Sequence, residues 1–407
     1  MTARFQAPRG THDVLPGDHL WWHIVRTMEE QAAAYGWRRI QTPGFEDTGL
    51  FARTSGAASD VVHKEMYTFT DRSDRSLTLR PEGTAPIARA YVEHGLHREP
   101  QPVKAYTIAP MYRYGRPGRG RYREHWQLSL EAIGSPGPDI DGEVIQFYVD
   151  LLGRLGVTEW ELHLSSIGDP NCRPQYVARL NEWLDAHDDL LDDDARHKRA
   201  TSPLQVFDVK NPELRAALDA APKITDALCD ECQAHFDGLR ARLAELEVPY
   251  SLDPLLVRGL DYYTRTAFEF VGPEENVNST ICGGGRYDGL VEAVGGKPTP
   301  GVGFGAGLER LQLAVERENE AVEAPKLDVF FALEPGTSAL PWLRGVRAAG
   351  FSADTDFAGR SLKGQLSQAT KVARRVVVLS GDGATLRTPG QPDRPVDLEG
   401  LLRELRT

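Results

Sequence analysis

The stretch that decides the fold runs from Ala105 to Gly134 and reads AYTIAPMYRYGRPGRGRYREHWQLSLEAIG. Residues typical of β-strands stand at both of its ends, and between them five arginines fall within the eleven residues 113–123, with no acidic residue among them. This pattern predicts two strands separated by a loop. The loop glycines would allow close approach to a ligand, and arginine side chains suit phosphate oxygens. A solvated basic turn is the alternative interpretation.

Further strands and helices are expected on both sides of this stretch. Apolar residues at helical spacing predict a helix over Trp21–Tyr35, and a strand follows from Arg38 until Pro43 stops it. Strands are also predicted at 75–80, 103–114, 122–134, 159–167 and 255–271, and helices at 84–94, 141–155 and 307–318. Because strands outnumber crossover helices between residues 60 and 135, we predict an α/β fold of the α+β kind, in which an antiparallel sheet is flanked by helices.

A chain of 407 residues is expected to form two or three domains. Residues 170–249 are rich in Asp, Ala and Leu, and their pattern predicts helices at Pro174–Leu191, Asn211–Ala221 and Ile224–Leu246, as in an inserted helical domain. A charged run that ends at Pro325 suits a linker, and beyond it strand and helix patterns alternate. We therefore expect a core in two parts, 1–169 and 250–318, an insertion at 170–249, a linker at 319–326 and a small α/β domain at 327–407.

The composition, 41% hydrophobic and 26% charged residues, is typical of a soluble globular protein. A net charge of −12 argues against a chain that coats nucleic acid by bulk electrostatics, although residues 326–407 carry 12 Lys and Arg against 9 Asp and Glu. The N-terminal residues show no apolar leader, and no stretch approaches the roughly 18 apolar residues of a membrane span, so no membrane association is expected.

The four cysteines are too few for a disulfide framework and suit a reducing compartment, so we expect a cytoplasmic location. Cys229 and Cys232, followed by His235, have the spacing of zinc ligands. A structural zinc needs four ligands, however, and no second pair of Cys or His with matching spacing stands nearby in the sequence. We favour the alternative, a pair of thiols at the start of a helix, and assign no metal ligand.

Several other segments carry chemistry-bearing residues in a recognisable order. They are Thr78-Leu-Arg-Pro-Glu82-Gly-Thr84, Gln127-Leu-Ser-Leu-Glu131, Leu256-Val-Arg258-Gly-Leu-Asp-Tyr262-Tyr263, Cys282-Gly-Gly-Gly-Arg286-Tyr-Asp288 and Gly301-Val-Gly-Phe-Gly-Ala-Gly-Leu-Glu309-Arg310. Gly303, Gly305 and Gly307 alone are a weak indication, since glycines also serve close packing. With the arginine loop, the full set resembles the histidyl-tRNA synthetase family of class II aminoacyl-tRNA synthetases, and the resemblance extends from Pro8 to Gln365.

The resemblance implies an architecture. The core would be the antiparallel sheet of a class II synthetase, with motif 1 at Tyr35–Glu46, motif 2 at Ala105–Gly134 and motif 3 at Gly301–Leu311. Motif 1 forms the dimer interface in the family, so a homodimer is expected. The insertion would clasp the acceptor arm of tRNA, and the C-terminal domain would bind the anticodon. There Arg360, Lys363, Lys371, Arg374 and Arg375 would contact phosphates, or else form solvated helix faces.

The resemblance also implies a reaction, in which L-histidine and ATP with Mg²⁺ give histidyl-adenylate and pyrophosphate, and histidine then passes to the 3'-terminal adenosine of tRNA(His). Its catalytic residues would be Arg113 at the α-phosphate, Arg258 opposite it in a role that a metal ion fills in related synthetases, and Arg310 at the polyphosphate tail. ATP would also contact Arg121 and Glu309. Fixed cations suit this chemistry because negative charge develops as the polyphosphate leaves.

The family pattern assigns six residues to histidine. Glu82, Thr84 and Gln127 would surround the α-amino group, Glu131 and Tyr263 would contact the imidazole, and Tyr262 would line the pocket. Gln127 and Glu131 are four apart on a predicted strand, so both should face the same side. Buried carboxylates need partners, which favours ligand contacts, and exposed strand carboxylates are the alternative.

Two departures from the family pattern keep other functions open. Gly115 stands where the family usually has a glutamate that contacts the adenine amino group, so the base would be held otherwise, for example by stacking on Tyr122. The C-terminal domain also looks short around 334–341 and 381–395. One rival is a non-catalytic paralogue, the histidine-sensing regulatory subunit of ATP phosphoribosyltransferase, and another is a module that binds tRNA-like RNA. Arg258 with its two tyrosines and the C-terminal domain favour the enzyme.

Overall fold

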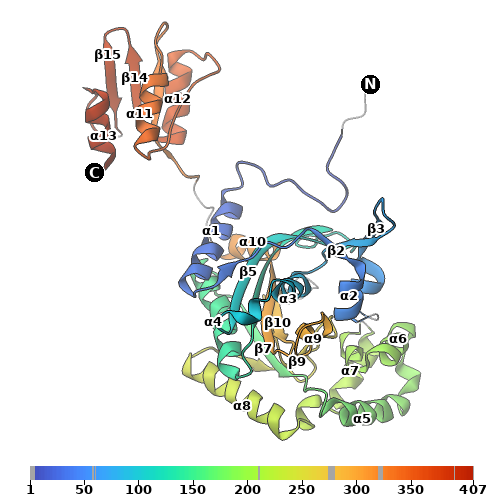
Figure 1. Cartoon of the computed structure of the whole chain (residues 1–407). Coiled ribbons are helices and arrows are strands. Elements are labelled where there is room, and N and C mark those ends of the chain that lie inside the picture. The colour runs from blue at the N-terminus through green and yellow to red at the C-terminus, as the bar shows by residue number, and fades with distance from the viewer. Residues whose placement is uncertain are drawn as a thin grey trace. The chain divides into compact units, whose positions relative to one another are not determined.

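A computed structural model describes residues 5–56, 59, 61–209, 211–273, 280–319, 324–388 and 390–406 (Figure 1). The chain divides into two compact units, Met1–Ala321 and Val322–Thr407, which are treated separately below. The centre of the predicted linker, residues 320–323, lies outside the described residues. None of the described helices is long and apolar enough to cross a membrane.

The first unit is built on an eight-stranded sheet. Neighbouring strands run antiparallel except at its two ends, where the first two strands and the last two strands are parallel. The predicted antiparallel sheet is therefore confirmed. In spatial order the strands are β1 (Arg38–Arg39), β5 (Val103–Tyr112), β6 (Glu124–Ile133), β11 (Gly301–Gly307), β10 (Thr280–Arg286), β9 (Thr264–Val271), β7 (Glu161–Ser166) and β8 (Ser251–Leu252).

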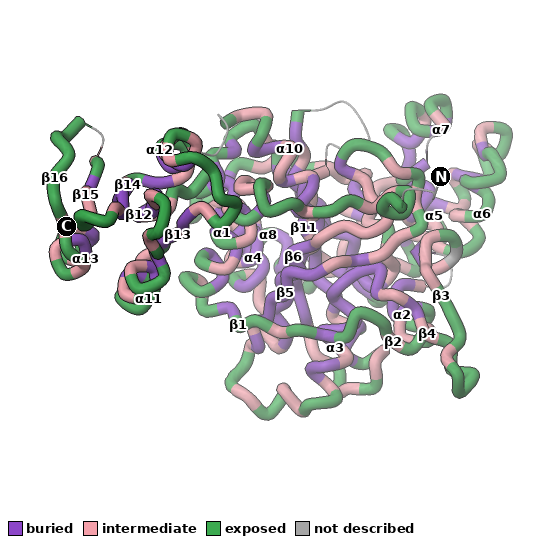
Figure 2. Tube along the Cα trace, turned by 90° about the horizontal axis from the view of Figure 1, so that it is seen from above, coloured by how far each residue is buried: buried purple, intermediate pink, exposed green. Residues whose placement is uncertain are grey.

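Helices cover the apolar face of this sheet. Leu128 and Leu130 of β6 point into a core that α1, α4, α8 and α10 close, with Trp21, Phe147 and Leu311 among its residues. The tube in Figure 2 shows buried residues along β5 and β6, in the interior of the unit. Because side chains alternate along a strand, Gln127, Ser129 and Glu131 face the opposite side. The helices are α1 (His19–Ala34), α4 (Pro138–Arg154), α8 (Asp230–Glu245) and α10 (Leu308–Glu318).

The opposite side of the sheet carries smaller elements. Helices α3 (Thr84–Glu93) and α9 (Leu290–Ala293) form a second apolar cluster there with residues of β5 and β9. A three-stranded sheet lies beside them, with the strand order β2 (Phe45–Asp47), β4 (Ser76–Leu79) and β3 (Tyr67–Thr70), together with α2 (Thr48–Thr54) and a π-helical turn η1 (Val61–Glu65).

The elements described between β7 and β8 are all helical. They are α5 (Arg173–Asp185), η3 (Asp188–Leu190), α6 (Asp193–Thr201), η4 (Pro203–Asp208), α7 (Pro212–Ala217), η5 (Leu218–Ala220), η6 (Ile224–Asp226) and α8. Tyr176, Leu180 and Leu214 pack in a core of their own, whereas α8 belongs to the main core. Helix α6 was not predicted, and the last predicted helix begins only at Asp230 rather than at Ile224.

The second unit is a five-stranded sheet with helices. Its strand order is β13 (Ala353–Thr355), β12 (Leu327–Leu333), β14 (Ala373–Ser380), β15 (Gly383–Arg387) and β16 (Arg394–Pro395), and its helices are α11 (Leu340–Ala348), α12 (Leu362–Val372) and α13 (Leu398–Arg406). Segment 381–395 contributes β15 and β16, which the sequence patterns did not predict.

Candidate active site

A cavity of about 360 Å³ opens on the polar face of the main sheet. It is lined by the loop between β5 and β6, by β10 and β11, by the start of α10 and by the segment before β9. The structure therefore brings together ten predicted site residues as lining residues: Glu82, Thr84, Arg113, Arg121, Gln127, Arg258, Tyr262, Tyr263, Glu309 and Arg310. The remaining one, Glu131, lies fully buried beneath them.

Glycines on β10 and β11 make room for these side chains. A Cβ atom added at Gly303 would collide with the Glu131 carboxylate, and one at Gly283 would collide with the Arg258 guanidinium. At Gly305 it would lie 2.8 Å from Nε2 of Gln127. The glycines of the Gly301–Gly307 run thus lie on a strand and let charged and amide groups lie flat across the sheet.

Three arginines converge on one side of the cavity with few acidic partners. Arg310 donates to the carbonyl oxygens of Thr280 (2.7 Å) and Gly120 (3.2 Å), and Arg113 donates to that of Pro81 (2.7 Å). Burial, and then the positive charges of Arg113 and Arg121, lower the pKa of Arg310. Cations gathered against their own repulsion favour an anionic ligand.

His125 belongs to the same cluster and was not predicted. It lines the cavity, and burial together with Arg113 and Arg310 lowers its pKa to about 3. His125 is therefore neutral at physiological pH and adds a polar group without adding charge. It is the second residue of β6, directly after Glu124, and nothing in the sequence pattern set it apart from other strand residues.

Arg258 lies in the segment before β9 and pairs with Glu269 of β9. Its guanidinium is 5.9 Å from the centre of the Tyr263 ring, and its Nε is buried without a hydrogen-bond partner in the described part of the chain. Although burial opposes the charge, Glu269 keeps the pKa of Arg258 above its ordinary value. Arg258 is thus a fixed cation with donor capacity left for a ligand.

The two predicted carboxylates near α3 are both buried, which excludes the alternative of exposed strand carboxylates. Glu82 is 3% exposed and accepts from the backbone N–H groups of Thr84 (2.6 Å) and Ala85 (2.9 Å) at the start of α3. Glu131 accepts from Thr84 Oγ1 (2.7 Å) and from the Tyr287 hydroxyl (2.5 Å). Burial raises the pKa of Glu131 to about 8.

Glu309 is the third buried carboxylate at the cavity. One oxygen accepts from the Trp126 backbone N–H at 2.9 Å, and the other, Oε2, is buried without a partner in the part of the chain that is described. Burial raises its pKa to about 7. An unsatisfied carboxylate oxygen at a cavity wall is a site for a ligand donor or a cation.

The segment that carries Tyr262 and Tyr263 is not the strand predicted at 255–271, because only Thr264–Val271 joins the sheet. Contacts from the helical segment hold it instead. Asp261 accepts from Ser202 Oγ and Gln205 Nε2, both at 3.0 Å, and Arg173 donates to the Tyr263 carbonyl oxygen. The helical segment therefore positions one wall of the cavity.

Gly115, the departure from the family pattern, lines the cavity beside Tyr122 and Glu65. Glu65 pairs with Arg121 at 3.0 Å, and a Cβ atom at Gly115 would lie 3.1 Å from Nε of Arg121. A larger residue at 115 would therefore press on Arg121. Tyr122 and Glu65 are an aromatic and an acidic residue that line the same cavity.

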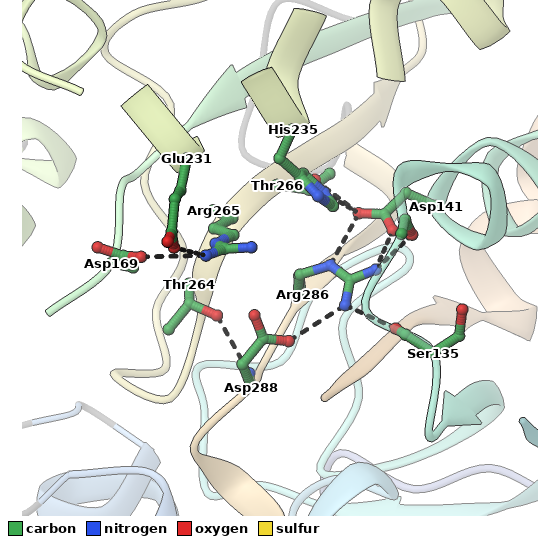
Figure 3. A network of polar contacts seen from close by, with 11 residues as sticks. Ser135, Asp141, Asp169, Glu231, His235, Thr264, Arg265, Thr266, Arg286 and Asp288 are labelled. Carbon is green, nitrogen blue, oxygen red and sulfur yellow. Dashed lines mark hydrogen bonds and ion pairs between the residues drawn. The ribbon is translucent and has the colours of Figure 1, made fainter. Parts of the chain in front are cut away.

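Arg286 lies in a second charged network, outside the cavity lining (Figure 3). The fully buried Arg286 pairs with Asp141 of α4, and it donates to the carbonyl oxygens of Ser135 and Gly137, both at 3.0 Å. Asp141 also accepts from Thr266 Oγ1 at 2.6 Å and lies 3.2 Å from Nε2 of His235 on α8. This network joins β9 and β10 to two helices.

Comparison of the sequence with known proteins identifies one family. Residues 10–311 match the family model described as histidyl-tRNA synthetase. A histidine–tRNA ligase of Natranaerobius thermophilus is 46% identical over 93% of this chain and 91% of that protein, and one of Moorella thermoacetica is 46% identical over 92% and 90%.

Solved structures agree with the sequence comparison. The apo histidyl-tRNA synthetase of S. aureus superposes with a TM-score of 0.82 at 34% identity, covering 99% of this chain and 100% of that chain. A Bacillus halodurans protein described as an ATP phosphoribosyltransferase regulatory subunit/histidyl-tRNA synthetase has a TM-score of 0.65 at 23% identity, covering 94% and 100%. The latter likeness shows the fold alone.

Proposed function

The chain belongs to the histidyl-tRNA synthetase family, and on that premise we propose that it activates L-histidine with ATP and transfers it to tRNA(His). The observation that carries this proposal is one cavity that joins a cluster of incompletely neutralised arginines to buried carboxylates and two tyrosines. A polyphosphate fits the arginines, and an amino acid with a polar side chain fits the other half. A cavity of this volume, about 360 Å³, suits small ligands.

In the first step a carboxylate oxygen of histidine attacks the α-phosphorus of ATP. The new bond joins that oxygen to phosphorus, the bond to the β-phosphate oxygen breaks, and pyrophosphate leaves with the electron pair. Arg113 and Arg258 would contact the α-phosphate and Arg310 the leaving polyphosphate, with Arg121 beside it. Because carbonyl groups and Glu269 already fix these cations, little reorganisation would be needed in the transition state.

For the amino acid, we propose that Glu82, Thr84 and Gln127 receive the α-amino group, and that Tyr263 and Glu131 recognise the imidazole beside Tyr262. Glu131 lies beneath the lining residues and accepts a hydrogen bond from the Thr84 hydroxyl. A site of satisfied hydrogen-bonding groups rejects analogues without the polar group by roughly 10⁴–10⁵-fold, so this arrangement would need no editing domain.

Mg²⁺ fits Oε2 of Glu309, which has no hydrogen-bond partner among the described residues. A carboxylate beside bound phosphates is the usual protein ligand of this ion, which would neutralise charge on the polyphosphate. Glu309 would hold the ion and Arg310, the next residue, would contact the same phosphates.

The test is histidine-dependent exchange between ATP and labelled pyrophosphate, followed by charging of tRNA(His). Exchange and charging are both expected, and histidinol without a carboxylate should support neither. Histidine-dependent binding to an ATP phosphoribosyltransferase without exchange would instead favour the regulatory rival. RNA binding without exchange would favour the RNA-binding module.

We further propose a cytoplasmic homodimer. Phe45 and Phe69 support it, because both rings are large, 51% and 43% exposed, and lie 6.1 Å apart on the small sheet, and Phe45 belongs to the segment that resembles motif 1. Substitution Phe45→Glu should yield monomers in analytical ultracentrifugation. A variant that sediments like the parent would place the interface elsewhere.

The finer domain roles are proposals too. Residues 170–249 would contact the acceptor arm, and 327–407 would bind the anticodon. Since the helical segment also supports Tyr263, its deletion would damage the cavity, and surface substitutions test the role better. Alanine at the exposed Arg179 and Arg215 should weaken charging of tRNA but leave pyrophosphate exchange unchanged.

A further inference from the structure

Three cysteines and an aspartate meet where the helical segment joins the main sheet. Asp169 follows β7, Cys172 precedes α5, and Cys229 and Cys232 stand at the start of α8. One potential ligand atom from each residue lies within 4.8 Å of the other three. The sequence spacing lacked a second pair of ligands for Cys229 and Cys232, and the fold supplies it from about 60 residues upstream.

The distances among these atoms match a tetrahedral metal site. The sulfur atoms of Cys172 and Cys232 are 3.9 Å apart, and Asp169 Oδ1 lies 3.6 Å from the Cys172 sulfur and 3.8 Å from that of Cys229. Zinc bonds of about 2.3 Å to sulfur and 2.0 Å to oxygen place sulfur ligands about 3.8 Å apart, and sulfur and oxygen about 3.5 Å apart. These three separations fit that geometry, and the remaining pairs of ligand atoms lie within 4.8 Å of one another.

The surroundings also suit a bound cation with thiolate ligands. Cys172, Cys232 and Asp169 are buried. The backbone N–H of Asp169 points to the Cys172 sulfur at 3.3 Å, and Arg265 contacts the other carboxylate oxygen, Oδ2, at 3.3 Å (Figure 3). Such outer contacts orient ligands, and the arginine offsets the negative charge that three thiolates and a carboxylate keep after binding Zn²⁺.

We propose that Asp169, Cys172, Cys229 and Cys232 form a structural zinc site. His235 is not a ligand, because it contacts Asp141 and Thr266. The metal would fix the starts of α5 and α8 to the end of β7. Arg173, next to Cys172, donates to the Tyr263 carbonyl oxygen, so the site would also keep one wall of the cavity in place.

The first experiment needs no variant. The full chain, purified with a thiol reductant and without chelator, should contain one zinc per chain by elemental analysis. After exchange into Co²⁺ it should show the visible absorption of tetrahedral cobalt with thiolate ligands. Absence of zinc would overturn the proposal. So would a disulfide between Cys172 and Cys232, detected by mass spectrometry in protein that was purified with the thiol reductant.

Variants then locate the metal. Cys172→Ser and Cys232→Ser should each reduce zinc content about tenfold or more, since a ligand is lost. Cys282→Ser is the matched control, because this buried cysteine lies outside the cluster and should retain one zinc. Asp169→Cys should retain zinc and Asp169→Ala should lose it. A chelator should lower the melting temperature of the parent but not that of Cys172→Ser. Equal zinc in Cys172→Ser, Cys282→Ser and the parent would contradict the assignment.

Discussion

Arginines gather in two regions of the first unit, fully buried in one and half-buried in the other, and the two regions treat the charge in opposite ways. Arg286 has Asp141 and Asp288 as carboxylate partners, and backbone oxygens of Ser135 and Gly137 accept its remaining donors. In the cavity, the acceptors of Arg310 among the described residues are carbonyl oxygens, and Arg310 faces Arg113 and Arg121.

The difference distinguishes two roles of arginine, one in stabilising the fold and one in binding an anionic ligand. A buried arginine whose charge is matched stabilises the fold, and its removal leaves an unpaired carboxylate. Arginines that repel one another cost stability in the free protein and gain a partner only when an anion binds. The environment of the guanidinium therefore distinguishes the two roles where the residue type cannot.

The largest effect is expected from Arg286→Ala. Loss of the cation leaves Asp141 buried without its arginine partner, with the Thr266 hydroxyl and His235 as its remaining contacts, so the free energy of unfolding should fall by about 3–5 kcal/mol. Urea unfolding at pH 7 measures it, with Arg310→Ala as the matched control, which should lose little because it also relieves repulsion. Equal losses in the two variants would abolish the distinction between the regions.

Arg258→Ala should act on the reaction instead. Removal of one preorganised cation is expected to slow histidine-dependent pyrophosphate exchange by roughly 10²–10³-fold, about 3–4 kcal/mol in the barrier. The protein should still fold, and the stability lost with the Glu269 pair should be smaller than in Arg286→Ala, because the Thr280 hydroxyl still donates to Glu269. Glu269→Gln keeps the cation and should reduce exchange far less. Normal exchange by folded Arg258→Ala protein would remove Arg258 from the catalytic set.

The two regions should also differ in pH dependence. The pKa of Glu131, about 8, lies above its ordinary value, so its contribution to stability is complete below pH 4.5 and is lost as the pH rises toward 8. Between these limits the parent should lose about 1.4 kcal/mol per pH unit relative to Glu131→Gln. Parallel stability curves for the two proteins from pH 5 to 8 would refute this charge state.

Asp141 should show the opposite trend. Although burial opposes ionisation, Arg286 and His235 hold the pKa of Asp141 below its ordinary value. The stability that its ionised form contributes is present above about pH 4 and is lost as the pH falls through the lower, folded-state pKa.

The smallest effect concerns an exposed arginine of the second unit. Arg374 is 66% exposed and 3.7 Å from Asp328, so Arg374→Ala should change the stability of the protein by less than about 1 kcal/mol. If it contacts a tRNA phosphate, the slope of binding affinity against salt should decrease by about one. An unchanged slope in filter-binding measurements would indicate a solvated residue.

Local patterns predicted much of the fold. Helices α1, α3 and α10 lie within about two residues of their expected ends, and Gln127 and Glu131 share a face of β6 as the alternation requires. Helix α6 escaped prediction because Ala195 is its one buried residue, which leaves no apolar stripe. The sequence of segment 255–263 resembles a strand because it is rich in apolar and aromatic residues. In the structure these residues are buried by tertiary contacts, and the strand begins only at Thr264.

Contacts between residues on neighbouring strands depend on the register of the sheet, and the sequence could not predict them. Glu269 faces Gly283 across the pair of β9 and β10, and this places it beneath Arg258. Glu131 faces Gly303 across β6 and β11 in the same way. Neither contact can be inferred from residue spacing along the chain. The residues that the family motifs named do line the cavity, with the exception of Glu131.

The contacts of Ser202 and Gln205 with Asp261 have a thermodynamic consequence. A ligand that shifts the helical segment should also shift the loop of Tyr262 and Tyr263, because the contacts to Asp261 join the two. The binding site of that ligand and the amino-acid pocket would therefore share a coupling free energy. Coupling between binding sites is reciprocal. Whatever factor such a ligand imposes on the affinity for the amino acid, the amino acid imposes the same factor on the affinity for that ligand.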